Sequence, residues 1–241
     1  MIVAVSAAAA DLPSGESLIE KFITQSGGAD AYAKAKSVSM DGSVEIVGRN
    51  ITGTVTIVQE GPKSWTSMDF PGIGAVEQGY DGQIAWENSA LQGPRIMEGD
   101  EKRAVERASS LSVITGWRDI YKEARTEGSA DVNGKPAWKV TMVPKDGQPE
   151  TFYFDKDSGL LVRMATVLST PLGEIPTEVT ISDYRPINGI STPFTMTQTA
   201  MNQNIVMKFN KVQYNAPVAR DRFDPPAPVK ALLAKKGAQG K

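Results

Sequence analysis

The sequence predicts an α+β protein that consists mainly of antiparallel β-strands, and three observations support this class. Apolar residues alternate with polar ones over most of the chain, which is typical of strands with one buried face. Short turn sequences such as Asn-Gly and Asp-Gly separate these segments, and helical periodicity is confined to a few short stretches. Together they predict a single domain over residues 11–224, a meander of about eleven strands curled over about three helices.

The first predicted helix covers residues 14–23 (SGESLIEKFI). Ser14 can cap its N-terminus, and its apolar residues recur on one face, namely Leu18, Ile19, Phe22 and Ile23. Gly27-Gly28 ends this helix. Residues 29–36 (ADAYAKAK) predict a second short helix because they are good helix formers.

Between these helices and residue 100 the period changes to two. Residues 38–46 and 51–57 alternate on either side of Gly48-Arg49-Asn50, which predicts a hairpin. Further alternation follows at residues 68–70 and 84–86, with Asp81-Gly82 as a turn.

A third helix is predicted over residues 100–116, where the alternation stops. Asp100 can cap it, Glu101 favours its first turn, and a weak helical face follows, made of Ala104, Ala108, Leu111 and Ser112. Glu98, Asp100 and Glu101 could instead form a pair of catalytic carboxylates. We prefer the helix interpretation because acidic residues are favoured at helix N-termini.

Strand patterns return after this helix, at residues 138–142, 152–154, 160–164, 179–181, 190–196 and 205–209. The parity of the apolar positions then shifts at Asn210-Lys211, which predicts a β-bulge there. The segment from Asp155 to Gly159 has acidic residues two apart, as calcium loops do. Most ligand positions of such a loop are not met, so we interpret it as a hairpin turn.

The composition argues against several classes of function. The net charge is −2 without a basic excess, so we expect no nucleic acid partner. The absence of Cys and His excludes Cys/His zinc sites, thiol catalysis and Ser-His-Asp triads. Gly72-Ile73-Gly74 lacks the third glycine of a dinucleotide site. We therefore expect no enzyme activity, no cofactor and no metal; a hydrolase that uses carboxylates is the least supported hypothesis.

The two ends of the chain differ in composition from the rest. Residues 1–10 (MIVAVSAAAA) form an apolar run that ends in alanines, as at a signal-peptidase site, so we expect the remnant of an export signal. The alternative is an Ala-rich disordered leader. No other segment approaches the ~18 apolar residues of a membrane-spanning helix. Residues 225–241 form a Pro/Ala/Lys-rich tail that we expect to be frayed beyond Pro225-Pro226.

The candidate site consists of large apolar residues on the alternating faces. About three short helices should leave part of this face uncovered, and an apolar groove is the usual place for a hydrophobic ligand. Methionine-rich linings accept apolar molecules of variable shape. The alternative for each residue is ordinary core packing. The candidate ligand-binding residues are Met68, Phe70, Ile84, Trp86, Trp138, Met142, Phe152, Phe154, Phe194, Met196, Met207 and Phe209.

Four stretches resemble a known family. They are LIEKFITQSGGADAYAKAKSVSMDGSVEI, GYDGQIAWE, ETFYFDKDSGLLVRM and VTISDYRPINGISTPFTM, and the likeness extends over roughly residues 14–215. They resemble the LolA/LolB-like superfamily of periplasmic proteins related to outer-membrane lipoprotein-sorting carriers. The resemblance implies an open, incomplete β-barrel whose concave side is plugged by helices, with acyl chains or other hydrophobic ligands held between them.

Two functions follow as hypotheses. The first is a periplasmic carrier or binding protein for a lipid or the acyl chains of a lipoprotein, in which burial of methylene groups supplies the affinity. The second is a non-enzymatic module of the cell envelope that binds a protein partner or senses stress and has a fully packed interior. A cavity between the sheet and the helices distinguishes them.

Overall fold

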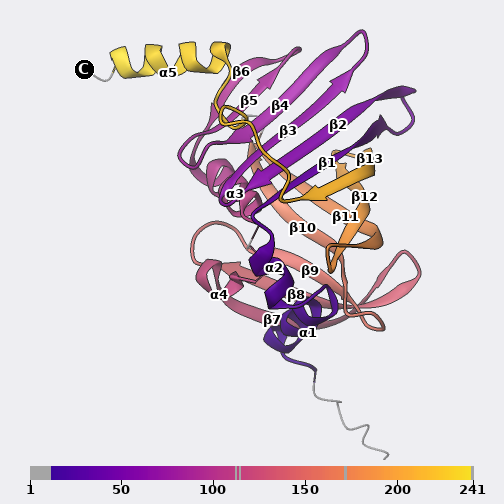
Figure 1. Ribbon diagram of the computed structural model, residues 1–241. Coiled ribbons are helices and arrows are strands. Elements are labelled where there is room, and N and C mark those ends of the chain that lie inside the picture. Colours follow the sequence, from indigo (N-terminus) through magenta and orange to yellow (C-terminus); the bar gives the residue numbers. More distant parts are fainter. Residues whose placement is uncertain (1–11, 112, 114, 171–172, 240–241) are drawn as a thin grey trace, which may run out of the picture.

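The computed structural model describes residues 12–239 except residues 112, 114, 171 and 172 (Figure 1). The expected export-signal remnant, residues 1–10, lies outside the described residues. Within the described part all strands belong to one antiparallel sheet of 13 strands in the order β6-β5-β4-β3-β2-β1-β13-β12-β11-β10-β9-β8-β7. Pairing of β1 with β13 joins a first meander, β1 to β6, to a second, β7 to β13. Because β6 and β7 are separate edges, the sheet is open, as expected.

The strands follow the turns of the sequence closely. Their bounds are β1 (Ser37–Ile46), β2 (Ile51–Glu60), β3 (Lys63–Phe70), β4 (Gly74–Tyr80), β5 (Ala85–Ser89), β6 (Gly93–Met97), β7 (Tyr121–Val132), β8 (Lys135–Pro144), β9 (Glu150–Asp155), β10 (Leu161–Thr170), β11 (Gly173–Ile187), β12 (Ile190–Ala200) and β13 (Gln203–Tyr214). The expectation of about eleven strands was therefore too low. The strands that sequence patterns missed are β4, β6 and β7.

Five helices lie in the described part of the chain: α1 (Gly15–Gln25), α2 (Ala29–Lys34), α3 (Gly99–Ser109), α4 (Trp117–Ile120) and α5 (Ala227–Gln239). The two predicted N-terminal helices are confirmed, and the side chain of Ser14 caps α1 by accepting a hydrogen bond from the Ser17 amide at 3.1 Å. The third predicted helix was too long. It ends at Ser109, and the separate short helix α4 begins at Trp117.

The C-terminal tail differs from the prediction, because α5 is a helix of 13 residues rather than a frayed end. It packs against β5 and β6, on the side of the sheet away from α3 (Figure 1). Val229 is fully buried there, and Lys236 contacts Glu98. Helix α5 is therefore an additional helix, on the convex side, that the predicted three helices did not include.

The predicted hairpins and the bulge are confirmed. In the first hairpin Met40 lies opposite Ile57, and Ile46 lies opposite Ile51. Between β1 and β13 the register moves from Asp41–Lys211 to Gly42–Phe209, so Asn210 is the extra residue. The turn from β9 to β10 is also as predicted. The Asp155 carboxylate accepts hydrogen bonds from the backbone amide and the hydroxyl of Ser158, both at 2.7 Å, and Gly159 has a φ of 73°.

The concave side of the sheet carries two large apolar clusters. The α1 cluster joins Leu18, Ile19, Phe22 and Ile23 of α1 to residues of β8 to β11 and to Trp117. The β1 cluster lies on β1, β2, β3, β12 and β13 and contains Val44, Val55 and Phe70. Among the described residues no helix is both long enough and apolar enough to cross a membrane.

Candidate ligand-binding site

Helix α3 is placed against the concave face by polar contacts at both ends. At its N-terminal end, Glu101 accepts a hydrogen bond from Arg95 of β6 at 2.8 Å. Near its C-terminal end, Arg107 donates to Glu150 of β9 at 2.8 Å. Ser109, at the last turn, is buried and hydrogen bonds to Ser64 of β3 at 2.6 Å. The helix therefore bridges the two meanders.

The residues of α3 that face the sheet are small. Ala104, Val105 and Ala108 follow one another on the inner side of the helix, where α1 has Leu, Ile and Phe at comparable positions. Methyl groups cannot reach the sheet opposite them, so space remains. A cavity of about 370 Å³ lies between the helix and the sheet, and we call it the α3 cavity.

The α3 cavity has a mainly apolar lining from both meanders. Its lining residues are Gln78, Met97, Glu101, Ala104, Val105, Arg107, Ala108, Val113, Tyr121, Glu150, Phe152, Met164, Ala165, Thr166, Leu168, Thr177, Val179 and Gln198. Its volume lies in the range of about 300–1,000 Å³ typical of small-molecule sites. The hypothesis of a hydrophobic ligand expects such a space, whereas a packed envelope module does not.

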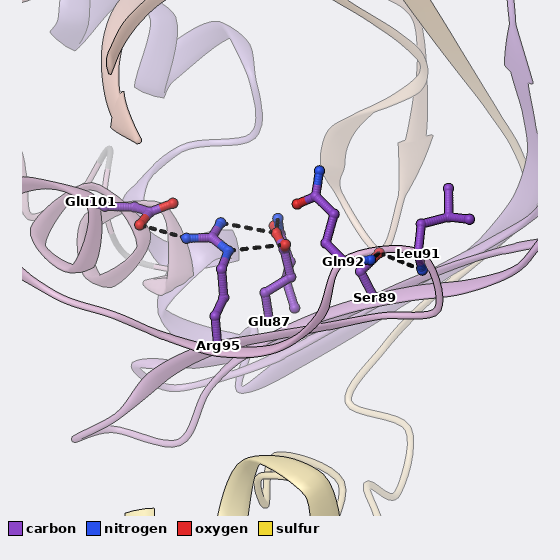
Figure 2. Close-up of polar contacts among 7 residues, drawn as sticks. Glu87, Ser89, Leu91, Gln92, Arg95 and Glu101 are labelled. Atoms are coloured by element: carbon purple, nitrogen blue, oxygen red, sulfur yellow. Dashed lines mark hydrogen bonds and ion pairs between the residues drawn. The ribbon is translucent and has the colours of Figure 1, made fainter. Parts of the chain in front are cut away.

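A partly buried ion-pair network borders the cavity where α3 begins. Arg95 donates to both carboxylate oxygens of Glu87, with Nε–Oε1 3.0 Å and Nη2–Oε2 3.1 Å, and it also binds Glu101 (Figure 2). Gln78 donates to Glu87 at 2.7 Å. Burial by itself would raise the pKa of Glu87, but the hydrogen bonds from Arg95 and Gln78 outweigh it and hold that pKa below its ordinary value. Glu87 is therefore ionised at neutral pH.

A second polar cluster borders the cavity near the end of α3. Glu150 accepts hydrogen bonds from Arg107 and from the hydroxyl of Tyr121, the latter at 2.6 Å. Burial, together with the charge of Glu150, raises the pKa of Tyr121, so its hydroxyl remains a donor. The three carboxylates at the two ends of α3, Glu87, Glu101 and Glu150, are thus bound by protein partners, which suits a structural role better than acid–base chemistry.

A second cavity lies farther along the same concave face. It has a volume of about 440 Å³ and lies between the turn from β5 to β6 and the turn from β12 to β13. We call it the rim cavity. Its lining residues are Val76, Glu87, Ser89, Leu91, Gln92, Gln198, Ala200, Met201, Gln203 and Ile205. Glu87 links it to the ion-pair network, and Gln198 lines both cavities.

The residues predicted from sequence lie mostly in packed cores. Phe152 lines the α3 cavity, whereas the other predicted residues are absent from the linings of both cavities. Met142 and Phe154 belong to the α1 cluster, with Trp138 packed against it. The β1 cluster contains Phe70, Phe194, Met207 and Phe209, and Met68 and Met196 pack against it.

Trp86 and Ile84 were predicted for the same face, but Trp86 faces the other way. Ala85 packs with Met97 toward α3, so Trp86, the next residue on β5, points to the convex side, where α5 lies. Trp86 is 1% exposed there. Ile84 is half-buried and precedes β5. Ligand binding by these residues remains a prediction.

Most of the cavity lining was not among the predicted residues because large apolar side chains fill the cores, whereas the cavity lies beside small and polar ones. Small residues, and not large ones, indicate where the cavity lies. Ala104 and Ala108, which sequence analysis had placed on a weak helical face, make space by being small. Gln78 and Gln198 could not be recognised from alternation because they are polar residues on the inner face of strands.

Sequence comparison did not identify relatives of known function: no protein-family model and no curated protein matches the chain. Several solved structures resemble it in fold. A DUF1329 family protein from Desulfovibrio piger ATCC 29098 has 14% identity and a TM-score of 0.60, and the match covers 90% of this chain and 100% of that one.

The second structure is a LolA superfamily protein from Nitrosomonas europaea, with 9% identity, a TM-score of 0.56 and coverage of 89% of this chain and 99% of that one. The third is a putative outer membrane lipoprotein-sorting protein domain from Vibrio parahaemolyticus, with 12% identity, a TM-score of 0.51 and the same coverage. At such identities the likeness concerns the fold alone. Together with the open sheet and its helices, it shows that this chain has a LolA-like fold.

Proposed function

We propose that this protein is a non-enzymatic carrier or binding protein for a hydrophobic ligand, a lipid or the acyl chains of a lipoprotein, and that it acts in the periplasm. The α3 cavity carries this proposal, because it is a mainly apolar space between the sheet and a helix. Each methylene group that enters it gains about 0.8 kcal/mol from leaving water. The LolA-like fold agrees with such a role by analogy.

The absence of enzyme activity is part of the proposal. The chain contains no His and no Cys. The carboxylates at the α3 cavity are held by Arg95, Arg107 and Tyr121 in the described structure. Groups that are tied in this way are poorly placed to exchange protons with a substrate.

The proposal is tested by titrating delipidated protein with an uncharged fluorescent acyl ester, such as the methyl ester of pyrene-labelled dodecanoic acid. We expect saturable binding at one site. Ala104→Leu should weaken it strongly because the added side chain occupies the α3 cavity. The matched control is Ala33→Leu on the exposed face of α2, which makes the same chemical change outside the cavity.

Absence of binding by folded wild-type protein contradicts the proposal. Equal binding by wild type and Ala104→Leu would show that the ligand lies elsewhere. Native mass spectrometry of freshly isolated protein gives a second measurement, since a carrier should retain a bound lipid and a packed envelope module should not.

A further inference from the structure

The α3 cavity and the rim cavity meet at one side chain, Gln198 of β12. Its neighbours across the sheet are Val179 of β11 and Ile205 of β13. Val179 lines the α3 cavity, and Ile205 lines the rim cavity. A ligand that filled both spaces would therefore pass Gln198.

The amide of Gln198 is available for such a ligand. The residue is half-buried, and its side chain has no hydrogen-bonding partner in the described part of the chain. Gln203, by contrast, uses its side chain fully, accepting from Arg49 at 2.8 Å and donating to the Val47 carbonyl at 3.0 Å. An amide can donate to a carbonyl oxygen and accept from an N–H or O–H group, so Gln198 suits an ester or amide linkage.

The rim cavity has several polar side chains in its lining and lies next to solvent. Beyond Gln198, the rim cavity is lined by Ser89, Gln92 and Glu87, and the carboxylate of Glu87 is already bound by Arg95 (Figure 2). At its margin Leu91 and Met201 are 76% and 70% exposed, so this end is next to solvent. Because the rim cavity is next to solvent, it suits the head of a ligand whose acyl chain lies under α3.

The charges along this path favour a head without negative charge. Glu87 is the charged residue in the described lining of the rim cavity, and no basic residue belongs to that lining. Arg95 pairs with Glu87 and Glu101. Arg107 pairs with Glu150 and with the exposed Asp146, so carboxylates outnumber guanidinium groups in these ion pairs. Arg49 lies outside the lining and is bound to Gln203.

We propose that the site, if the function proposed above is correct, selects a single-chain acyl ester or amide with an uncharged head. The chain occupies the α3 cavity, the carbonyl of the linkage accepts a hydrogen bond from the Gln198 amide, and the head lies in the rim cavity beside Glu87. A free fatty acid is disfavoured because its carboxylate would lie near Glu87 in a partly desolvated groove, where like charges repel more strongly than in water.

The experiment compares three ligands of equal chain length at pH 8, where the carboxyl group of myristic acid is ionised. They are monomyristoylglycerol, myristate and tetradecanol, each measured by displacement of N-phenyl-1-naphthylamine from the wild-type protein. We expect the glycerol ester to bind at least about tenfold more tightly than myristate because of charge repulsion. It should also bind more tightly than tetradecanol, which has no carbonyl.

Two variants separate the contribution of the Gln198 amide from that of the Glu87 charge. Gln198→Leu should bring the glycerol ester and tetradecanol to similar affinity, and Gln83→Leu, the same change in an exposed turn, should not. Glu87→Gln should narrow the difference between the ester and myristate, and Glu45→Gln, at an exposed position of β1, should leave it unchanged.

The inference is overturned if wild-type protein binds myristate as tightly as the ester, a comparison that depends on no variant. It is also overturned if Gln198→Leu leaves the preference for the ester over tetradecanol intact. Failure of all three ligands to bind folded wild-type protein would instead contradict the proposed function itself, so the two failures can be told apart.

Discussion

Helices α1 and α3 are both eleven residues long and both lie on the concave side of the same sheet, yet they produce different interiors. Helix α1 buries Leu18, Ile19, Phe22 and Ile23, which fill the space in front of β8 to β11. Helix α3 presents alanines and a valine, and a cavity of about 370 Å³ remains beneath it.

The two helices also differ in the contacts that attach them to the sheet. The contact of α1 with the sheet is apolar and includes aromatic packing, with ring centroids of Phe22 and Phe154 5.9 Å apart. Helix α3 is joined to the sheet through Arg95–Glu101 and Arg107–Glu150. Because polar contacts attach α3 at its two ends, its middle is free to cover a ligand. The side chains of α1, by contrast, fill the space between that helix and the sheet.

Phe22→Ala should have the largest effect on stability, because it removes a ring from the packed end of the molecule. Phe22 is 5% exposed and contacts Phe154. We expect a loss of about 3–5 kcal/mol in the free energy of unfolding, as for other buried Phe→Ala changes. Urea denaturation followed by circular dichroism measures it. A loss below ~1 kcal/mol would mean that the α1 end is not tightly packed.

Gly15→Ala enlarges the packed end by one methyl group. A Cβ atom at Gly15 would lie 2.4 Å from the carbonyl oxygen of Ala124, so the backbone must shift. Alanine is the better helix former, but we expect the clash to prevail and to cost about 1–3 kcal/mol. Thermal unfolding of the variant checks this, and a higher melting temperature than wild type would contradict it.

Lowering the pH should weaken the ion-pair network at the start of α3, because it protonates Glu87. Because the pKa of Glu87 is depressed in the folded protein, its ionised form stabilises the fold above the ordinary pKa of 4.5. That contribution is lost as the pH falls through the lower, folded-state value. The difference in unfolding free energy between wild type and Glu87→Gln should therefore be largest at neutral pH and should shrink below pH 4.5. A constant difference from pH 7 to pH 3 would contradict this.

Ala104→Leu adds three carbon atoms at the α3 end and should still change stability little. The new side chain can enter the α3 cavity instead of displacing packed neighbours. We expect the free energy of unfolding to stay within about 1 kcal/mol of wild type, in contrast to the overpacked Gly15→Ala. Equal destabilisation by the two changes would show that the α3 end is as tightly filled as the α1 end.

Calcium should not change the melting temperature of the protein, which makes its effect the smallest of those compared. The Asp155 carboxylate that begins the turn from β9 to β10 is used by Ser158, and the described residues contain no cluster of three metal-ligating side chains. Differential scanning calorimetry with calcium and with a chelator should give the same melting temperature. A rise with calcium would restore the metal-loop interpretation of this turn.

Much of the fold was accessible from sequence because hairpins are local structures. The segments around Gly48-Arg49-Asn50 and Asp155 to Gly159 carry both the alternation and the turn residues that specify a hairpin. The two edge strands, β6 and β7, were missed. In β7 the charged residues Glu123, Arg125 and Glu127 are spaced two apart and pair with one another at a sheet edge, where such charges discourage aggregation but remove the apolar alternation.

The site was less accessible because a cavity depends on distant residues together. Sequence patterns indicated which side chains are large and inward-facing, and most of these, such as Phe154 and Phe209, fill the cores. The α3 cavity forms where small residues of α3 face strands of the second meander. These segments are far apart in the sequence, so no local sequence pattern can predict that they face each other. The helix at residues 227–239 was missed because its burial also depends on a distant surface, the outer side of β5 and β6.

The most direct measurement locates a bound acyl chain by methyl NMR. Protein with labelled Val, Leu and Ile methyl groups is mixed with a nitroxide-labelled methyl stearate, which broadens the signals of methyl groups near the chain. We expect broadening at Val105, Val113 and Leu168, which line the α3 cavity, and sharp signals at Leu18, Ile19 and Ile23. Broadening at the α1 end, or equally at both ends, would contradict it.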